Sequence, residues 1–174
     1  MKPLPDSLFR QILIAHFAAT CAMAGVIWIV QLVIYPQFAD VGAEAFPAYH
    51  RHYTDLITLI VGPLMLVELV TAIFIVAKLR TTPGMRIFAI SGLATVALLW
   101  IITAVVQVPA HERLAAGLDK TLVDSLVFGN WVRTALWTIR VPLAWGMLEV
   151  TWRRIHEQPL DADGISPMTC RISS

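Results

Sequence analysis

Eight polar side chains that could bind or catalyse lie at the ends of four long apolar segments. His50 and His111 carry imidazoles, which can act as general bases or bind a metal ion. Arg133 can bind an anion or an oxyanion. The other five, which could position a substrate, are Gln31, Tyr35, Tyr53, Gln107 and Asn130. Because an unpaired polar group in hydrocarbon is costly, we expect these eight side chains to form a site.

Helical spacing places the polar residues of each segment on one face. Gln31 and Tyr35 are four residues apart, which is about one helical turn. His50 and Tyr53 also share a face near the start of the second segment. Similar spacing gives the third and fourth segments one polar stripe each: Thr103, Gln107 and His111 in the third, and Asn130, Arg133, Trp137 and Arg140 in the fourth. We expect these stripes to point into a helix bundle.

The residue types leave three interpretations of this polar set open. In the first, the side chains only form hydrogen bonds between helices. In the second, His50 and His111, with Glu112 as a further ligand, bind a transition metal or a haem. In the third, the site binds an organic substrate without a metal. The sequence does not decide whether the cofactor is a metal, a haem or none.

The composition predicts an integral membrane protein, because 57% of the residues are hydrophobic and 14% are charged, with a mean hydropathy of +0.71. A spanning helix needs roughly 20 apolar residues. Four segments meet this length, at about 11–36, 55–78, 86–109 and 128–150. The predicted fold is all-α, an antiparallel four-helix transmembrane bundle over residues 1–156, followed by a disordered cytoplasmic tail at 157–174. Prolines near or inside the segments should bend or end the helices.

The charge distribution predicts the orientation in the membrane. Basic residues flank the ends that share one side, and they are Lys2, Arg10, Lys78, Arg80, Arg86, Arg153 and Arg154. The positive-inside rule therefore places both termini in the cytoplasm and the polar set in the outer leaflet, as in a bacterial inner membrane. The expected partners are membrane lipid, a lipophilic small molecule and further copies of the chain. No nucleic-acid partner is expected.

Two charged residues lie deep in the apolar segments. Glu68 and Arg140 are each about 20 Å below the outer end of their helices, given a rise of about 1.5 Å per residue. An isolated charge at this depth would be unstable in the membrane, so we expect an ion pair. The pair is interpreted as one that fixes the packing of the helices, and the alternative is a role in proton movement or substrate binding.

Two short boxes resemble a known family. The sequences VVQVPAHERLAAGLD and GNWVRTALW resemble the helix-three and helix-four boxes of the anthrone-oxygenase-like family of small four-helix membrane proteins, N-V-P-x-N-x-x-L and W-N-H-V-R-T. The matching residues are Pro109, Leu114, Asn130, Val132, Arg133 and Thr134. Gln107 and His111 stand where the family has Asn, and Trp131 stands where it has His.

The resemblance implies an oxidation of a lipophilic aromatic or quinone-like molecule by molecular oxygen. In this interpretation His50 or His111 removes a proton from the activated carbon, and Arg133 and Asn130 stabilise the enolate oxygen. Two non-enzymatic alternatives remain: a haem- or metal-binding membrane subunit, and a small transport or assembly protein whose polar stripes only pack helices.

Overall fold

The computed structural model describes residues 6–78 and 83–157, which form four long helical stretches without any strand. The first stretch begins with α1 (Asp6–Ile29) and continues through a π-helical turn, η1 (Val30–Ile34), into α2 (Tyr35–Gln37) and the 3-10 turn η2 (Phe38–Asp40). The second stretch is α3 (Phe46–Lys78).

The third stretch is also interrupted by a π-helical turn. It consists of α4 (Pro83–Ile102), the π turn η3 (Thr103–Gln107) and α5 (Val108–Leu114). The last stretch is the single helix α6 (Lys120–Glu157). The predicted loop at 79–85 and the predicted tail at 157–174 fall mostly outside the described residues.

Three of these stretches are long and apolar enough to cross a membrane: Ser7–Asp40, Phe46–Lys78 and Met85–Leu114. The chain is therefore an integral membrane protein by length and composition. The predicted fourth segment belongs to α6, which is long but is not among the three. Arg133 and Arg140 interrupt its apolar run.

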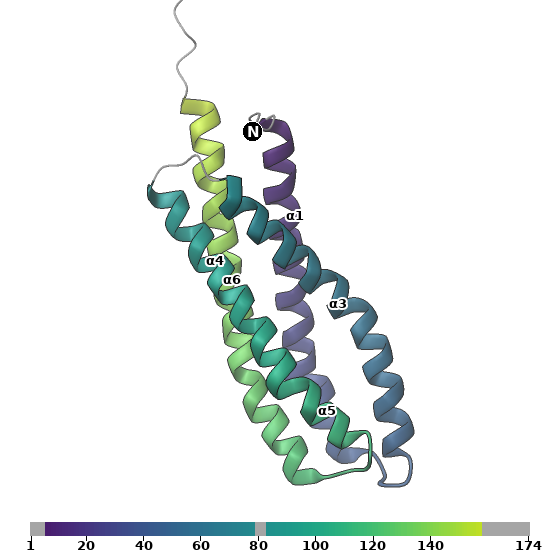
Figure 1. Cartoon of the computed structure of the whole chain (residues 1–174). Helices are drawn as coiled ribbons and strands as arrows, with labels where there is room; N and C mark the ends of the chain where they lie inside the picture. Colours follow the sequence, from purple (N-terminus) through teal and green to yellow (C-terminus); the bar gives the residue numbers. More distant parts are fainter. Residues whose placement is uncertain (1–5, 79–82, 158–174) are drawn as a thin grey trace, which may run out of the picture.

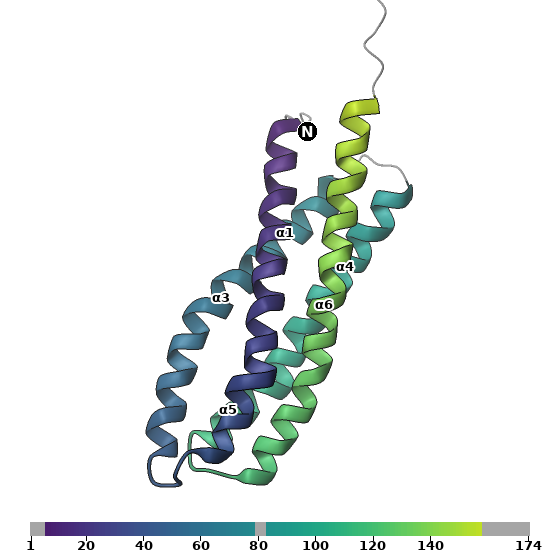
Figure 2. The same cartoon turned by 180° about the vertical axis from the view of Figure 1, so that it is seen from behind.

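Figures 1 and 2 show the long helices lying side by side in an elongated molecule. Each of α1 and α4 contacts both α3 and α6. The lower end in Figure 1, here called the site end, contains α2, η2, α5 and the first turns of α3 and α6. The start of α1 and the end of α6 lie at the opposite end. Each end of the molecule therefore contains segments that are far apart in the sequence.

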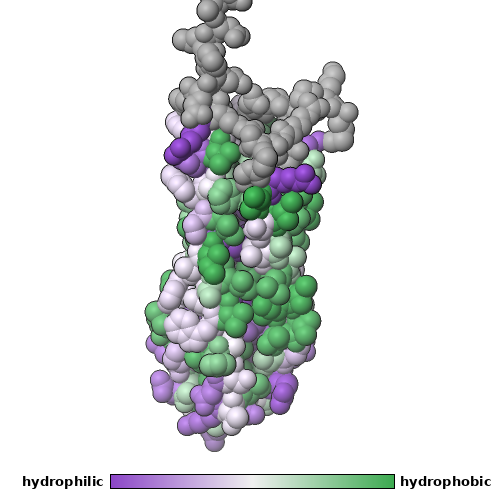
Figure 3. Space-filling model, turned by 90° about the vertical axis from the view of Figure 1, so that its left-hand side faces the viewer, coloured by the Kyte–Doolittle hydropathy of each residue, from purple (hydrophilic) through white to green (hydrophobic). Residues whose placement is uncertain are grey.

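The interior contains two apolar clusters separated by polar side chains. The larger cluster lies toward the site end and includes Met23, Phe38, Phe46 and Leu99. The smaller one, around Leu13 and its neighbours, lies toward the other end. Large apolar side chains also cover the outside, and Figure 3 shows them across the middle of one face, with hydrophilic residues gathered at the site end. Such an apolar exterior is suited to contact with lipid.

The prolines affect the helices in two ways. Pro63 and Pro142 lie inside α3 and α6 without ending them. Pro36 and Pro109 instead are the second residue after the end of η1 and of η3, respectively. Proline lacks an amide hydrogen and clashes with the carbonyl four residues earlier, so a wider turn before it relieves the conflict. Each stretch thereby continues beyond its proline.

Candidate functional site

A row of hydrogen bonds joins the two histidines at the site end. His50 Nε2 and His111 Nδ1 are 2.9 Å apart, and His111 Nε2 is 2.9 Å from the Tyr35 hydroxyl. The same hydroxyl donates to Gln107 Oε1 at 3.3 Å. One proton arrangement satisfies all three contacts: each histidine donates from Nε2, and Tyr35 donates to Gln107. The row links α3, α5, α2 and η3.

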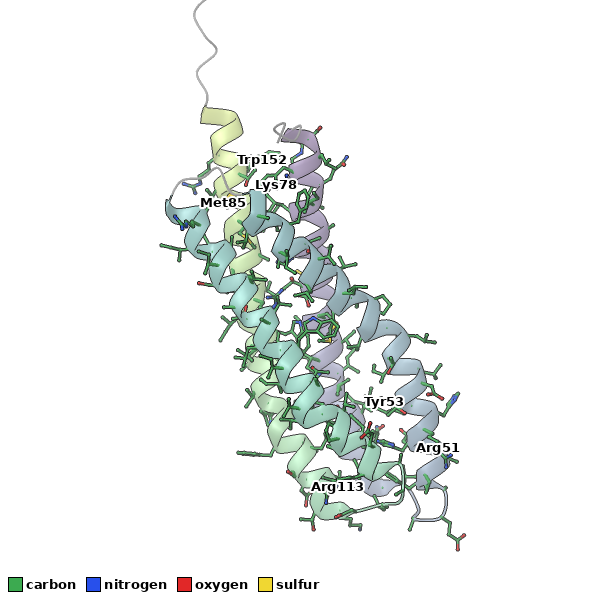
Figure 4. All side chains as sticks on the ribbon, viewed as in Figure 1. Arg51, Tyr53, Lys78, Met85, Arg113 and Trp152 are labelled. Carbon is green, nitrogen blue, oxygen red and sulfur yellow. The ribbon has the colours of Figure 1, made fainter. Side chains whose placement is uncertain are left out.

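Aromatic rings enclose this row. Phe38 and Phe46 are fully buried, and each ring centroid lies 5.4 Å from that of His50. The rings of His50 and His111 are themselves stacked, with centroids 5.1 Å apart. Tyr53 lies at the edge of the same group, and Figure 4 shows it between α3 and α5, whereas Arg51 lies on the outer side of α3. The imidazoles are thus held rigidly.

A second polar network surrounds Arg133. Its guanidinium Nη1 donates to Asn130 Oδ1 at 3.0 Å, and Asn130 Nδ2 donates to Gln31 Oε1 at 2.9 Å. Gln31 Nε2 donates to the carbonyl of Val127 at 3.1 Å. The guanidinium also stacks over the ring of Trp137, 5.3 Å from its centroid. These contacts hold the side chain of Arg133 in one position.

Arg133 is 5% exposed and interacts electrostatically with Tyr35 and His111. Among the residues whose side chains the structure describes, no carboxylate lies within ion-pair distance of its guanidinium. A buried cation without a counter-ion is unfavourable unless a ligand or a dipole compensates it. Arg133 is therefore the strongest indication of an anion or oxyanion site.

The two networks meet at a cavity of about 430 Å³. Tyr35, Tyr53, Gln107, His111 and Arg133 all contribute to its wall. Most of the remaining wall is apolar, from α1, α3 and α4, and includes Met23, Ile27, Ile57, Val61, Met65 and Trp100. Its volume is in the range of small-molecule sites, and an apolar wall with few polar groups is typical of them.

The cavity is accessible from the side of the bundle between α3 and α5. Helices α3 and α5 contact each other little, and exposed residues of both line the cavity, among them Thr58, Val108 and Glu112. Val108 is surrounded by other exposed apolar residues, including Val105 and Val106. A molecule dissolved in lipid could enter there without crossing water.

The structure separates the predicted site residues into two layers. Tyr35, Tyr53, Gln107, His111 and Arg133 reach the cavity, and so does Glu112 at its rim. The second layer consists of Gln31, His50 and Asn130, whose side chains contact cavity residues instead. Direct contact of His50 or Asn130 with substrate is therefore not supported by their position. They orient His111 and Arg133.

The predicted metal ligands do not form a cluster in the described part of the chain. No group of three or more histidine, cysteine, aspartate or glutamate side chains could hold a metal ion there. The facing nitrogens of His50 and His111 are hydrogen-bonded to each other. Glu112 is exposed at the cavity rim and forms no ion pair with either histidine.

Glu68 and Arg140, the two charged residues expected to pair, lie in a separate buried group nearer the middle of the helices. Arg140 Nη2 is 2.9 Å from Glu68 Oε1, and both residues are at most 1% exposed. Trp137 Nε1 donates to Glu68 Oε2 at 2.9 Å, and Thr20 donates to Oε1 at 2.7 Å. Trp137 therefore contacts both this group and Arg133.

Several residues of the site were not indicated by polarity. Phe38 and Phe46 come from the connector between the first two segments, and Trp100 comes from an apolar run. The only signal for Phe38 and Phe46 is that large aromatic residues are unusual in an exposed connector, and the sequence gives no signal for Trp100. Thr134 was matched only through the family box, and it donates to the carbonyl of Asn130 at 3.0 Å.

No protein-family model matches the chain, and neither a curated protein nor a solved structure matches it. The resemblance to anthrone oxygenases thus depends on the two sequence boxes alone. Function has to be argued from the geometry of the site.

Proposed function

We propose that this chain is an integral membrane oxidoreductase of the anthrone-oxygenase type. Its substrate is a lipophilic aromatic or quinone-like molecule that enters the cavity from the lipid. The observation that carries this proposal is that two features line the same apolar cavity. One is the hydrogen-bonded pair of His111 and Tyr35, which can accept a proton, and the other is Arg133, a buried cation without a carboxylate partner. An acid–base pair and an oxyanion site are the two elements that carbon-acid chemistry needs.

The first step is removal of a proton from an activated CH₂ group of the substrate. Tyr35 and His111 are the groups of the row that both reach the cavity and can carry a transferred proton. In the second proton arrangement each hydrogen bond between Tyr35, His111 and His50 has the opposite direction, so that Tyr35 donates to His111 and His111 donates to His50. The Tyr35 oxygen then takes the substrate proton and passes its own to His111 Nε2. His111 then gives its Nδ1 proton to His50 Nε2. The positive charge ends on His50, which is shielded from the cavity by His111.

The second step is stabilisation of the enolate oxygen that the deprotonation creates. Arg133 supplies a fixed positive charge at the cavity wall, and Asn130 holds its guanidinium in place. Because the surroundings are apolar, the attraction is stronger than it would be in water. Gln107 provides a further amide donor next to Tyr35.

Molecular oxygen is the oxidant in this proposal. The electron-rich carbon transfers electrons to O₂ and forms a C–O bond, which gives a hydroperoxide after protonation. Loss of water from the hydroperoxide leaves a carbonyl group. The balance is CH₂ + O₂ → C=O + H₂O, with the carbon oxidised and the oxygen reduced. The protein supplies the base, the oxyanion site and a cavity that excludes water.

The same proposal includes four antiparallel membrane crossings, with both termini in the cytoplasm and the cavity in the outer leaflet of a bacterial inner membrane. The fourth crossing is α6. Arg133 and Arg140, the arginines within its apolar run, are buried against other helices, whereas its exposed residues include Phe128, Ile139 and Trp145. The lipid-facing side of α6 is therefore apolar, even though its average composition is not.

The test is oxygen consumption by the detergent-purified protein with anthrone as the probe, measured with an oxygen electrode and corrected for protein-free oxidation. We expect quinone formation in proportion to oxygen uptake. His111→Asn should lower the rate by at least about 100-fold, because general-base catalysis contributes roughly that much. Gly62→Phe should also lower the rate, since Gly62 lines the cavity and a side chain there meets open space.

Two matched variants control for nonspecific damage. His52→Asn changes an exposed histidine on the same helix as His50, and Gly25→Phe adds a ring at an exposed glycine outside the cavity, where a side chain also meets open space. Both should retain the wild-type rate. No oxygen uptake above background by the wild-type protein, or a full rate in His111→Asn, would reject the proposal.

A further inference from the structure

The cavity wall carries an unusual concentration of buried polar atoms without a protein partner. Five buried side-chain atoms of the described residues have no hydrogen-bond partner, and four of them belong to residues of this wall. The four are Trp100 Nε1, Thr103 Oγ1, Gln107 Nε2 and Arg133 Nε. Leaving such atoms unpaired costs free energy, so their gathering at one cavity indicates a site built for a polar ligand.

The chemistry of these atoms restricts the ligand. The indole Nε1, the amide Nε2 and the guanidinium Nε can only donate a hydrogen bond. The Thr103 hydroxyl can donate or accept. A complementary ligand must therefore present acceptors, such as carbonyl or oxyanion oxygens.

These donors form two groups at different depths. Gln107 and Arg133 lie near Tyr35, toward the site end. Thr103 and Trp100 precede Gln107 by four and seven residues on α4 and η3, which is about one and two helical turns deeper. One turn advances by about 5 Å, comparable to the length of a six-membered ring. The apolar wall between them is suited to the ring itself.

We propose that Trp100 and Thr103 form an inner polar subsite, which binds an acceptor oxygen on the ring edge opposite the oxygen bound by Arg133 and Gln107. The favoured ligand class is a lipophilic ring with acceptor oxygens on opposite edges, as in a para-dione. This inference deepens the proposed function and rests on the same cavity. It adds that the second oxygen is recognised by residues of α4 and η3 that take no part in the proton transfer.

The experiment compares two ligands of one skeleton on protein in lipid nanodiscs. Binding of 2,3-dimethyl-1,4-naphthoquinone and 2,3-dimethylnaphthalene is measured by titration calorimetry. The methyl groups block addition of thiols to the ring. We expect the dione to bind at least about tenfold more tightly, since several donors gain a partner. Equal affinity for the two ligands would overturn the proposal without any variant.

Two inner variants locate the second oxygen. Thr103→Val keeps the shape of the side chain, and Trp100→Phe removes the indole donor. Each should weaken binding of the dione by roughly three- to tenfold and leave binding of the hydrocarbon unchanged. Thr151→Val is the matched control, because Thr151 lies on α6 outside the cavity and its hydroxyl donates to the carbonyl of Met147 in its own helix at 2.9 Å, with Met85 Sδ as a weaker contact. Equal losses for both ligands would overturn the inner subsite.

Binding is measured without turnover, so the inner subsite and the oxidoreductase proposal can each be rejected independently of the other. Tight binding of the dione without oxygen uptake with anthrone would support the subsite and reject the oxidoreductase. Oxidation of anthrone with no preference for the dione would support the oxidoreductase and reject the subsite.

Discussion

Glu68 is a carboxylate in the interior of a membrane protein, and each of its oxygens has a partner. Oε1 accepts from Thr20 and from Arg140, and Oε2 accepts from the indole of Trp137. On the other side, Arg140 Nη1 donates to the carbonyl of Gly92 at 2.6 Å. Removing one partner of a buried ion pair of this kind lowers the stability of the folded protein, since the remaining charge would be uncompensated.

Glu68→Ala should therefore destabilise the protein by about 3–5 kcal/mol. Arg140 would be left buried with no carboxylate in the described residues nearby. The measurement is the free energy of unfolding from a titration with sodium dodecyl sulfate, followed by far-ultraviolet circular dichroism. Glu68→Met combined with Arg140→Met should recover much of the loss, because it removes both charges.

The matched control is Glu149→Ala, which breaks the ion pair of Glu149 with Arg153. That pair is solvent-exposed, with side chains 38% and 67% exposed, so we expect a change of about 0–1 kcal/mol. Similar losses for Glu68→Ala and Glu149→Ala would contradict the structural role of the buried pair.

The sequence predicts the polar residues better than it predicts their contacts. Spacing alone places Asn130, Arg133 and Trp137 on one face, and all three are buried. Depth alone pairs Glu68 with Arg140. Contacts between helices depend on their rotation, which the sequence pattern leaves open by tens of degrees. For this reason the sequence alone does not predict that His50 contacts His111 instead of the cavity. The same holds for Asn130, which contacts Arg133 instead of the cavity.

At the scale of elements, the two π turns decide which side chains meet. Each π turn contains one residue more than an α-helical turn of the same rise, so it rotates everything that follows by about 100° relative to an uninterrupted α-helix. Gln31 lies in η1 and Gln107 lies in η3. Tyr35 and His111 follow these turns, and their hydroxyl and imidazole meet at 2.9 Å.

The sequence signals a proline at both places but does not signal a π turn. Proline disfavours the α-helix just before it, which is compatible with a bend, an end or a wider turn. Pro63 lies in an equally apolar stretch, and α3 continues through it. Only the packing of the neighbouring helices distinguishes these outcomes.

Deleting Val105 should convert η3 into an α-helical turn and rotate α5 by about 100°. His111 would then leave Tyr35 and His50, so we expect oxygen uptake with anthrone to fall at least about 100-fold while helix content stays unchanged. Circular dichroism and the oxygen electrode measure the two quantities. Val105 is 68% exposed, so the deletion removes no buried contact.

Val105→Ala shortens the same exposed side chain without changing the register of the helix, and it should retain activity. If the deletion variant were as active as Val105→Ala, the π turn would have no role in placing His111.

At the scale of the whole molecule, the distribution of charge along its axis sets the expected orientation. Arg86 is exposed near the end where α1 begins, and Asp124 is exposed near the site end. Basic residues of the described chain are concentrated at the former end, among them Arg10, Lys78, Arg86 and Arg153. By the positive-inside rule we expect that end to lie in the cytoplasm.

Single cysteines at these two positions test the orientation. In a background with Cys21 and Cys170 replaced by serine, Asp124→Cys should react with a membrane-impermeant maleimide on intact spheroplasts. Arg86→Cys should react only after the membrane is opened. Labelling in the reverse order would place the cavity in the cytoplasmic leaflet, and equal labelling of both would contradict a single orientation.

The location of Arg140 on the last helix also has a consequence for biogenesis. The first three helical stretches are long and apolar enough to cross a membrane, whereas α6 does not meet the same measure. Glu68 enters the bilayer when α3 does, and its cation arrives 72 residues later in the nascent chain. Between these events Glu68 lacks the partner that it has in the complete structure. Synthesis of the last helix supplies this partner, so we expect insertion of α6 and closure of the helix packing around Glu68 to occur together.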